Sequence, residues 1–138
     1  MSMMLLFSSI DPTDTQASFA QQGKASFYAK KFTGRHTANG ERVDATAFEA
    51  AHRTLPFNTL VEVTNLRNNR SVVVRINDRG PFTRGRVLDM THAAAHALGF
   101  ISHGVATVKL RVVGKGKFIA ARLAALPIDY EPLMQPVL

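Results

Sequence analysis

Two acidic residues in turn-forming stretches are the first candidates for chemistry in this sequence. Glu41 directly follows an Asn-Gly pair, which is typical of a tight turn, and Asp78 ends an apolar stretch just before an Arg-Gly-Pro triplet. Enzymes that cleave glycosidic bonds commonly use two carboxyl groups, of which one is kept protonated by its surroundings and the other stabilises or activates. The pair therefore suits glycoside cleavage if the fold brings the two carboxyl groups together.

A purely structural interpretation of these two residues stays open at this point. Acidic side chains in turns usually accept hydrogen bonds from backbone amides or pair with arginines at the surface. The Gly-Pro pair after Asp78 favours a more specific role, because Pro81 restricts Gly80 to an extended backbone and Gly80 lets the backbone approach a ligand closely. The break after Asp78 therefore fixes where its carboxylate points.

Histidines offer a weaker candidate for a metal site. His92 and His96 stand four residues apart on a predicted helix, where such a pair can bind a metal ion from one face. No glutamate follows His92 and no third ligand is evident, so we expect exposed helix histidines, no metal site and no cofactor. His52 belongs instead to a separate polar cluster, in which it precedes Arg53.

Aromatic and basic residues surround the acidic candidates. Aromatic side chains can stack on sugar rings, although most aromatic residues of a small barrel belong to its core. The candidates for stacking are Phe27, Tyr28, Phe32, Phe57 and Phe82. Several arginines, Arg79 among them, crowd the same region, where they form either a solvated basic surface or ligand contacts.

Length and charge bound the possible functions. A chain of 138 residues most often forms one domain, and it buries a proper core without cross-links. Because the sequence has no cysteine, disulfides and thiolate metal sites are excluded. The 17 Lys and Arg against 10 Asp and Glu give a net charge of +7, which favours an anionic partner such as nucleic acid, a cell-wall polymer or an outer-membrane surface. No stretch approaches the ~20 apolar residues of a membrane span.

Short strands must position these residues. Alternation of apolar and polar residues predicts half-buried strands at 60–66 and 105–113, and apolar character predicts strands at 71–77 and 25–29. Two adjacent asparagines in the stretch 67–70 tolerate the positive φ of a tight turn, so we expect an antiparallel hairpin there.

One helix is predicted, and a second stretch is ambiguous. The alanine-rich residues 93–98 favour a helix that Thr91 caps and Gly99 ends in a left-handed conformation. The stretch 45–52 also has helical propensity but is short, and Pro56 follows it, so its state stays open. Short strands separated by turns, together with one helix, suggest a small β-barrel.

The sequence divides into three parts. Residues 1–22 lack periodicity and are rich in polar residues, so we expect a flexible leader or the remnant of a signal peptide. Residues 23–113 hold the strands and the helix, and we expect them to form the barrel domain. Residues 114–138 begin with Gly and Lys and contain three prolines, so we expect a linker and C-terminal tail, with a weak helix at 118–126.

Several motifs, in order, resemble the rare lipoprotein A family. The resemblance rests on Gly-Lys-Ala-Ser-Phe-Tyr, Thr-Ala-Asn-Gly-Glu, Ala-Ala-His-Arg-Thr-Leu-Pro-Phe, Val-Thr-Asn-Leu and Val-Arg-Ile-Asn-Asp-Arg-Gly-Pro-Phe, found at residues 23–28, 37–41, 50–57, 63–66 and 74–82. It continues through 85–89 and 93–95 to 104–106, and so covers roughly 23–113. It implies a mostly β fold, namely a six-stranded double-psi β-barrel with one or two short helices.

The resemblance also implies an activity. It implies a peptidoglycan lytic transglycosylase that cleaves the β-1,4 bond between N-acetylmuramic acid and N-acetylglucosamine and leaves 1,6-anhydro ends. We accordingly expect peptidoglycan glycan strands as the partner, the periplasm of the bacterial cell envelope as the location, and no binding of nucleic acid. We also expect a monomer without a stable membrane anchor in this chain, since no cysteine is available for lipid attachment.

Carried over residue by residue, the resemblance assigns roles to Asp78, Glu41 and His52. Asp78 is expected to be the acid/base, Glu41 to stabilise positive charge on the sugar, and His52 to hydrogen-bond the site, all facing one groove. The roles of the two carboxylates can be exchanged, because the sequence does not show which one is more desolvated. Further glycan contacts are expected from Thr37, Asn39, Arg79, Tyr28 and Phe82.

Three other functions compete with the transglycosylase. One is a non-catalytic module that binds cell-wall polysaccharide, as expansins loosen walls without demonstrable hydrolysis. The others are a hydrolase of another polysaccharide and a nucleic-acid binder that relies on charge alone. The presence of both Glu41 and Asp78 favours an enzyme, because binding alone does not require two placed carboxylates.

Overall fold

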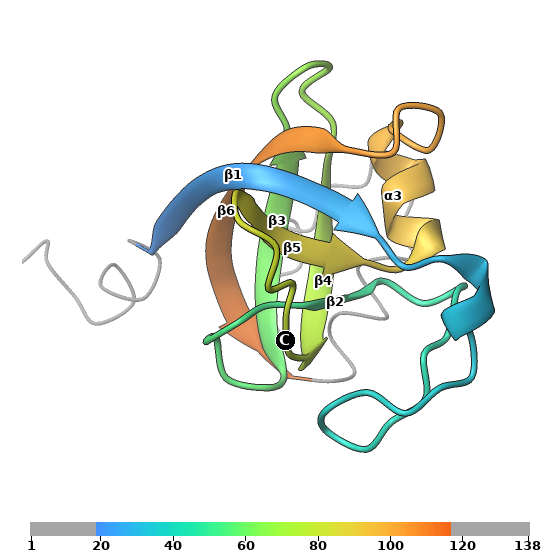
Figure 1. The fold of residues 1–138 in the computed structure, drawn as a ribbon. Helices are drawn as coiled ribbons and strands as arrows, with labels where there is room; N and C mark the ends of the chain where they lie inside the picture. The colour runs from blue at the N-terminus through green and yellow to red at the C-terminus, as the bar shows by residue number, and fades with distance from the viewer. Residues whose placement is uncertain (1–18, 117–138) are drawn as a thin grey trace, which may run out of the picture.

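Six strands of this protein close into a β-barrel, as Figure 1 shows for the computed structural model, which describes residues 19–116. The strands are β1 (Ala20–Phe27), β2 (Glu49–Ala51), β3 (Thr59–Asn65), β4 (Ser71–Asp78), β5 (Arg86–Met90) and β6 (Ala106–Lys115). The helices in this part of the chain are α3 (His92–Leu98) and the single 3-10 turn η1 (Lys30–Phe32). The mostly β barrel of six strands that the resemblance implied is confirmed.

The strand order around the barrel is β1-β5-β2-β4-β3-β6. β1 pairs with β5 and β2 pairs with β4 in parallel, whereas the other neighbours are antiparallel. Because β2 and β4 are parallel, their carboxyl ends lie together, and Ala51 pairs with Asp78. The segment 28–48 connects β1 to β2 and projects from the barrel beside this end (Figure 1).

The hairpin between β3 and β4 is confirmed. The two strands pair in antiparallel register from Leu60 with Arg75 to Thr64 with Ser71. Asn69 adopts a φ of 62°, which supplies the left-handed residue that the turn requires. The alternation of 60–66 and the apolar character of 71–77 were enough to recognise both strands, and the adjacent asparagines were enough to recognise the turn between them.

The helix lies where the sequence placed it, but Thr91 does not cap it with its side chain. The Thr91 hydroxyl instead donates to the Ala47 carbonyl at 2.6 Å, which ties the start of α3 to the segment before β2. At the other end Gly99 has a φ of 80° and terminates the helix in the left-handed conformation, as predicted.

Two strands were missed and two boundaries differ. The ambiguous stretch 45–52 contains β2, and β5 was not expected as a strand. Both strands are too short to show a periodic pattern in the sequence. Pairing with a strand on either side holds them in place. β1 begins at Ala20, three residues before the expected start of the barrel, and β6 continues to Lys115. The expected helix at 118–126 and residues 1–18 of the expected leader lie outside the described residues.

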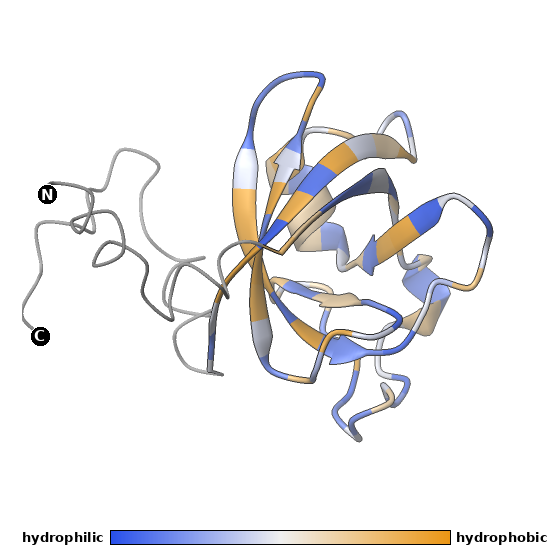
Figure 2. Cartoon of the chain, turned by 90° about the vertical axis from the view of Figure 1, so that its left-hand side faces the viewer, coloured by the Kyte–Doolittle hydropathy of each residue, from blue (hydrophilic) through white to orange (hydrophobic). Residues whose placement is uncertain are grey.

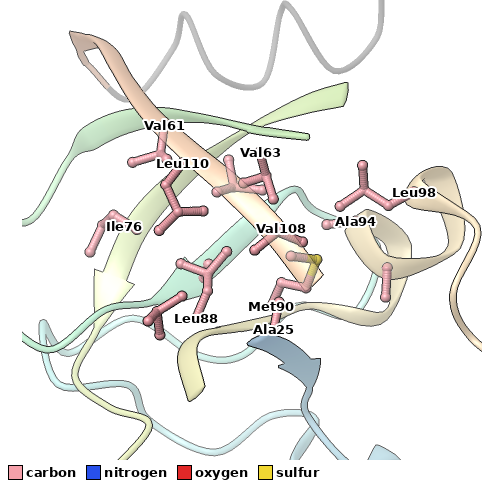
Figure 3. Packing of buried hydrophobic residues seen from close by; sticks show 14 of the residues in the cluster. Ala25, Val61, Val63, Ile76, Leu88, Met90, Ala94, Leu98, Val108 and Leu110 are labelled. Atoms are coloured by element: carbon pink, nitrogen blue, oxygen red, sulfur yellow. The ribbon is translucent and has the colours of Figure 1, made fainter. Parts of the chain in front are cut away.

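Alternating apolar residues from the strands fill the barrel (Figures 2 and 3). Val61 and Val63 of β3 and Val108 and Leu110 of β6 are fully buried, whereas the polar residues beside them, Glu62, Thr107, Lys109 and Arg111, are more exposed. α3 closes one side of this core with buried side chains that include Leu98. None of the helices in the described residues is long and apolar enough to cross a membrane.

The hairpin and the helix are joined through one buried carbonyl. Asn65 is 1% exposed and donates its side-chain amide to the Leu98 carbonyl at 2.9 Å, while its Oδ1 accepts from the Arg67 amide at 3.0 Å. Asn68, which is exposed, donates to the same Leu98 carbonyl at 3.0 Å.

We expect Asn65→Ala to lower the free energy of unfolding by about 1–3 kcal/mol, because it removes a buried donor and leaves the Arg67 amide without its acceptor. Asn68→Ala is the matched control and should cost less than about 1 kcal/mol, since solvent replaces an exposed partner. Equilibrium unfolding in urea measures both variants. Equal losses for the two would contradict this assignment.

Candidate active site

Asp78 is held firmly at the carboxyl end of β4. Its Oδ1 accepts hydrogen bonds from the backbone amides of Ala38 and Arg79, both at 2.8 Å, and its Oδ2 accepts one from the Tyr28 hydroxyl at 2.8 Å. Three donors around this half-buried carboxyl group fix its orientation. Asp78 therefore combines a defined position with partial access to solvent.

The sharp turn after Asp78 orients the neighbouring side chains. Gly80 has a φ of 120°, a conformation that only glycine adopts readily, and this turns the chain away from β4. Phe82 follows and is 77% exposed, the largest exposure among the large apolar side chains of the described residues. Arg79 points the other way: its guanidinium donates to the Leu55 carbonyl at 2.9 Å and stacks on the Phe57 ring. Arg79 thus secures the loop 52–57 against the end of β4.

Tyr28 is a permanent hydrogen-bond donor to Asp78. Burial raises the pKa of the Tyr28 hydroxyl far above its ordinary value, and the hydrogen bond to Asp78 and the charges of Asp78, Asp89 and Glu49 raise it further. The phenol therefore stays protonated at all physiological pH values. It keeps one oxygen of Asp78 engaged whatever the pH.

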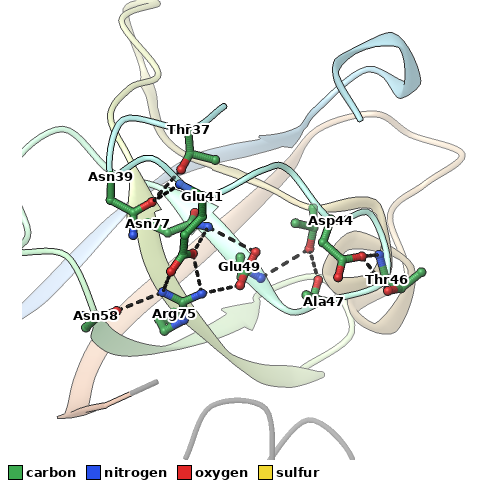
Figure 4. Close-up of polar contacts among 11 residues, drawn as sticks. Thr37, Asn39, Glu41, Asp44, Thr46, Ala47, Glu49, Asn58, Arg75 and Asn77 are labelled. Carbon is green, nitrogen blue, oxygen red and sulfur yellow. Dashed lines mark hydrogen bonds and ion pairs between the residues drawn. The ribbon is translucent and has the colours of Figure 1, made fainter. Parts of the chain in front are cut away.

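Glu41 is held by a buried arginine. Arg75, whose side chain is 4% exposed, donates from Nη2 to Glu41 Oε1 at 2.7 Å and from Nη1 to Glu41 Oε2 at 3.2 Å (Figure 4). Asn77 adds a hydrogen bond from Nδ2 to Glu41 Oε1 at 3.0 Å. This fork-like pairing fixes the orientation of Glu41, and its side chain remains 27% exposed.

Sequence reasoning missed a third carboxylate, Glu49 at the start of β2. Arg75 Nη2 also donates to Glu49 Oε2, and Asn77 Nδ2 donates to Glu49 Oε1 at 3.1 Å. We refer to Arg75, Asn77, Glu41 and Glu49 as the Arg75 cluster (Figure 4). The sequence offered no clear signal for Glu49, because the secondary structure of the stretch 45–52 was left open and the burial of β2 is visible only in the structure.

Burial raises the pKa of the Glu49 carboxyl above its ordinary value. Arg75 opposes this shift, and the nearby charges of Glu41 and Asp44 add to it. In the Arg75 cluster, Glu49 is the more buried of the two glutamates, with a side-chain exposure of 14%. Glu49 therefore accepts a proton at a higher pH than an ordinary glutamate does.

One loop contacts both predicted catalytic carboxylates. Within the turn 37–41, the Thr37 hydroxyl donates to Asn39 Oδ1 at 2.7 Å, and the same oxygen accepts from the Glu41 amide at 3.1 Å. In the same turn, the Ala38 amide donates a hydrogen bond to Asp78, and the Asn39 amide donates one to the Asn77 carbonyl at 3.3 Å. The structure thus brings the Glu41 turn onto the end of β4, and it places Thr37 and Asn39 as braces of that turn.

His52 lies behind this site. Its backbone amide donates to the Asp78 carbonyl at 3.1 Å, but its ring is buried and bonds elsewhere. Nδ1 accepts from the amides of Thr54 and Leu55, both at 3.1 Å, and Nε2 lies 2.8 Å from Gln21 Oε1. With Nδ1 occupied as an acceptor, Nε2 carries the proton. His52 therefore braces the loop after β2.

The environment of His52 keeps the ring neutral. Burial lowers the pKa of His52 from 6.5 to about 4, and the charges of Arg53 and Arg79 contribute. A neutral ring can accept from two backbone amides, whereas a protonated ring cannot. The position of the loop that carries Leu55 and Phe57 thus depends on an uncharged His52.

The remaining candidates divide between core, surface and site. Phe27 packs edge-to-face against Phe100 and His92, and Phe32 lies under the guanidinium of Arg35. His96 is exposed on α3, and within residues 19–116 no three His, Cys, Asp or Glu side chains group in a way that could hold a metal ion. A cavity of about 290 Å³ adjoins the site, and Tyr28, Lys30, Val43 and His92 are among its lining residues.

Comparison with known families identifies the chain. The lytic transglycolase family matches residues 20–110, well over half of the 138 residues. The chain belongs to this family. Curated relatives agree with the resemblance to rare lipoprotein A: "Probable endolytic peptidoglycan transglycosylase RlpA" of Nostoc sp. is 62% identical over 96 residues, which cover 68% of this chain and 26% of that protein.

A second relative of this lytic transglycolase chain is "Endolytic peptidoglycan transglycosylase RlpA" of Neisseria meningitidis serogroup A. It is 49% identical over 106 residues, which cover 77% of this chain and 44% of that protein. The chain therefore spans less than half the length of these two curated relatives.

Two solved structures share the fold of this member of the lytic transglycolase family. Streptomyces papain inhibitor is 24% identical with a TM-score of 0.56, covering 70% of this chain and 96% of its own. A mutant of Clavibacter michiganensis expansin in complex with cellohexaose is 18% identical with a TM-score of 0.57, covering 72% and 52%. With the closed strand order, these neighbours establish the double-psi β-barrel that the resemblance implied.

The buried, neutral His52 predicts acid lability. The folded protein lowers the pKa of His52, so the unfolded chain binds the proton first, and the stability from the neutral ring is fully present above about pH 6.5. That stability should be lost as the pH falls from about 6.5 towards 4, by up to about 3 kcal/mol. His52→Gln should lose this pH dependence, and His96→Gln, on the exposed face of α3, should keep it. Urea unfolding between pH 4 and 7 measures the effect, and an unchanged slope in His52→Gln would refute it.

Proposed function

We propose that this chain is a peptidoglycan lytic transglycosylase, a carbon–oxygen lyase that cleaves the β-1,4 bond between N-acetylmuramic acid and N-acetylglucosamine with formation of 1,6-anhydro ends. The observation that carries the proposal is the turn 37–41, which places Glu41 in the Arg75 cluster and donates the Ala38 amide to Asp78. The names of the curated relatives support the substrate and the bond type.

Asp78 serves as acid and then as base in this proposal. As the acid, its carboxyl group gives a proton to the glycosidic oxygen, and the bond from that oxygen to C1 of the muramic residue breaks. The C6 hydroxyl of the same residue then bonds to C1, and its proton returns to Asp78, so no water enters the product.

The hydrogen bonds of Asp78 support this role. Once the proton leaves, the carboxylate is stabilised by Tyr28 and by the amides of Ala38 and Arg79, all at 2.8 Å. These donors are in place before the reaction, so they need no rearrangement when the charge develops.

Glu41 stabilises the positive charge that develops at C1. Its carboxylate is paired with Arg75 and is still 27% exposed, so one side of it can face a sugar. Phe82, which is 77% exposed beyond the end of β4, offers an apolar face on which a sugar ring can stack. His52 acts only through the loop that it braces.

The partner in this proposal is the peptidoglycan glycan strand in the bacterial cell envelope, with the periplasm as the location. The net charge of +7 favours association with a polymer that carries carboxylates. We propose that the chain works as a monomer.

Asp78→Asn should reduce cleavage of purified sacculi by ~10²–10⁴-fold, because it keeps the size of the side chain but removes the titrating proton. Glu62→Gln is the matched control: Glu62 pairs with Arg111 on the barrel surface, and its substitution should leave the rate within about twofold. Mass spectrometry of the soluble products measures both the rate and the chemistry.

The product ends decide between the proposals. Products with 1,6-anhydro ends support the transglycosylase, whereas reducing ends would indicate a hydrolase on the same barrel. Glycan binding by wild-type protein with no products at all would leave the non-catalytic wall-binding module. Cleavage at the wild-type rate by Asp78→Asn would overturn the role of Asp78.

A further inference from the structure

Arg75 is shared by two glutamates rather than one. Its Nη2 donates to Glu41 Oε1 at 2.7 Å and also to Glu49 Oε2, and Asn77 Nδ2 bridges the same two carboxylates at 3.0 and 3.1 Å. Two oxygens bonded to a single nitrogen can be no farther apart than the two bonds combined. The carboxyl groups of Glu41 and Glu49 are therefore immediate neighbours in the Arg75 cluster (Figure 4).

The charges of these three ionisable side chains do not cancel. A pair of Glu41 and Arg75 alone would be neutral and would offer little electrostatic help to a developing cation. With Glu49 ionised, two negative charges share one positive charge. We propose that Glu49 is a positioning residue that keeps the Glu41 side of the site negatively charged by providing Arg75 with a second carboxylate. This role rests on the proposed transglycosylase function.

Glu49 is fixed more firmly than Glu41. It starts β2, where it pairs in register with Arg75 of β4, and its carbonyl accepts from the Thr91 amide at 2.9 Å. Glu41 lies in a turn outside the strands. Glu49 thus holds Arg75 in place from the barrel wall, and Arg75 in turn orients Glu41.

The amide of Asn77 supports two ionised carboxylates. Asn77 is 1% exposed and directs its Nδ2 to both glutamates, while its Oδ1 is buried without a hydrogen-bond partner in the described part of the chain. An unpaired buried carbonyl oxygen has a free-energy cost of about 1–3 kcal/mol. This orientation is favourable only if both neighbours are acceptors.

The charge of the Arg75 cluster depends on pH. Protonation of Glu49, whose pKa burial raises, removes one negative charge and leaves Glu41 balanced by Arg75. The charged and titratable groups around Glu49 are Arg75 of β4, Glu41 and Asp44 of the segment before β2, and Tyr28 after β1. Cleavage should therefore decline on the acidic side as Glu49 gains a proton.

Glu49→Gln tests the charge, because glutamine keeps the shape and an acceptor oxygen for Arg75. We expect kcat on isolated glycan strands to fall by roughly 10- to 100-fold with little change in KM, from the loss of one unit charge near the reacting sugar. The acidic limb of the pH–rate profile should change as well. Glu62→Gln is the matched control, since Glu62 pairs with Arg111 on the barrel surface at 2.9 Å, and it should keep the rate and the profile.

An NMR titration of Glu49, which does not require the protein to be active, complements these assays. The carboxyl carbon of Glu49, followed by NMR in wild-type protein, should titrate above its ordinary range, and in Glu41→Gln it should shift to lower pH because a neighbouring negative charge is gone. This measurement decides whether the two carboxylates are coupled even if Glu49→Gln folds poorly.

The outcomes separate the two proposals. An active wild-type protein whose Glu49→Gln variant keeps the full rate and the same acidic limb would overturn the role of Glu49 and leave the transglycosylase standing. A Glu49 titration that is the same in wild-type protein and in Glu41→Gln would also overturn the role of Glu49. A wild-type protein that titrates as expected but cleaves no glycan would refute the proposed function instead, and the role of Glu49 in cleavage with it.

Discussion

The buried positive charge of Arg75 is the constraint on which the site depends. A guanidinium at 4% exposure must be paired, because an isolated buried charge is costly and the loss of one partner from a buried pair typically destabilises by about 3–5 kcal/mol. Here the partners are Glu41, Glu49 and Asn58, from three different parts of the chain. The pairing of one arginine in β4 therefore fixes the projecting segment 28–48 against the barrel wall.

The Arg75 cluster and Asp78 are both positioned by the carboxyl end of β4. Residues 75–78 of β4 place the guanidinium, the Asn77 amide and the Asp78 carboxylate within four positions, and the turn 37–41 closes over all three. The barrel also braces this arrangement from outside, through the buried ring of His52 and the guanidinium of Arg79. Hydrogen-bonded carboxylates thus come together at the end of one strand of a small fold.

Much of this fold could be predicted from pattern, and some of it could not. β3 alternates clearly, β4 is strongly apolar and two adjacent asparagines lie between them, so the hairpin was recognised from the residues. The helix was recognised because it is alanine-rich and ends at a glycine. The three-residue strand β2 has no period to detect, and its neighbours alone make it a strand. The number of strands and the double-psi arrangement came from the family resemblance, because closure of a barrel depends on contacts between distant segments.

The sequence predicted only part of the candidate site, because some of its residues are defined by contacts between distant segments. Asp78 and Glu41 stood out because turns present them, and the structure places the Glu41 turn against Asp78. The family resemblance pointed to His52 as a site residue, but its hydrogen-bond partners, Gln21 and two backbone amides, are visible only in the structure. Glu49 was missed because burial and a shared arginine distinguish it, and neither can be read from the sequence around it.

The central claim is that Asp78 and Glu41 act on one sugar residue at one site. A double-mutant cycle of Asp78→Asn and Glu41→Gln, measured as kcat/KM on isolated glycan strands, tests this most directly. Residues that act as a unit are not additive, so we expect the double variant to be no more than about tenfold slower than the slower single variant. Losses that multiply would show that the two carboxylates work independently and would contradict the account.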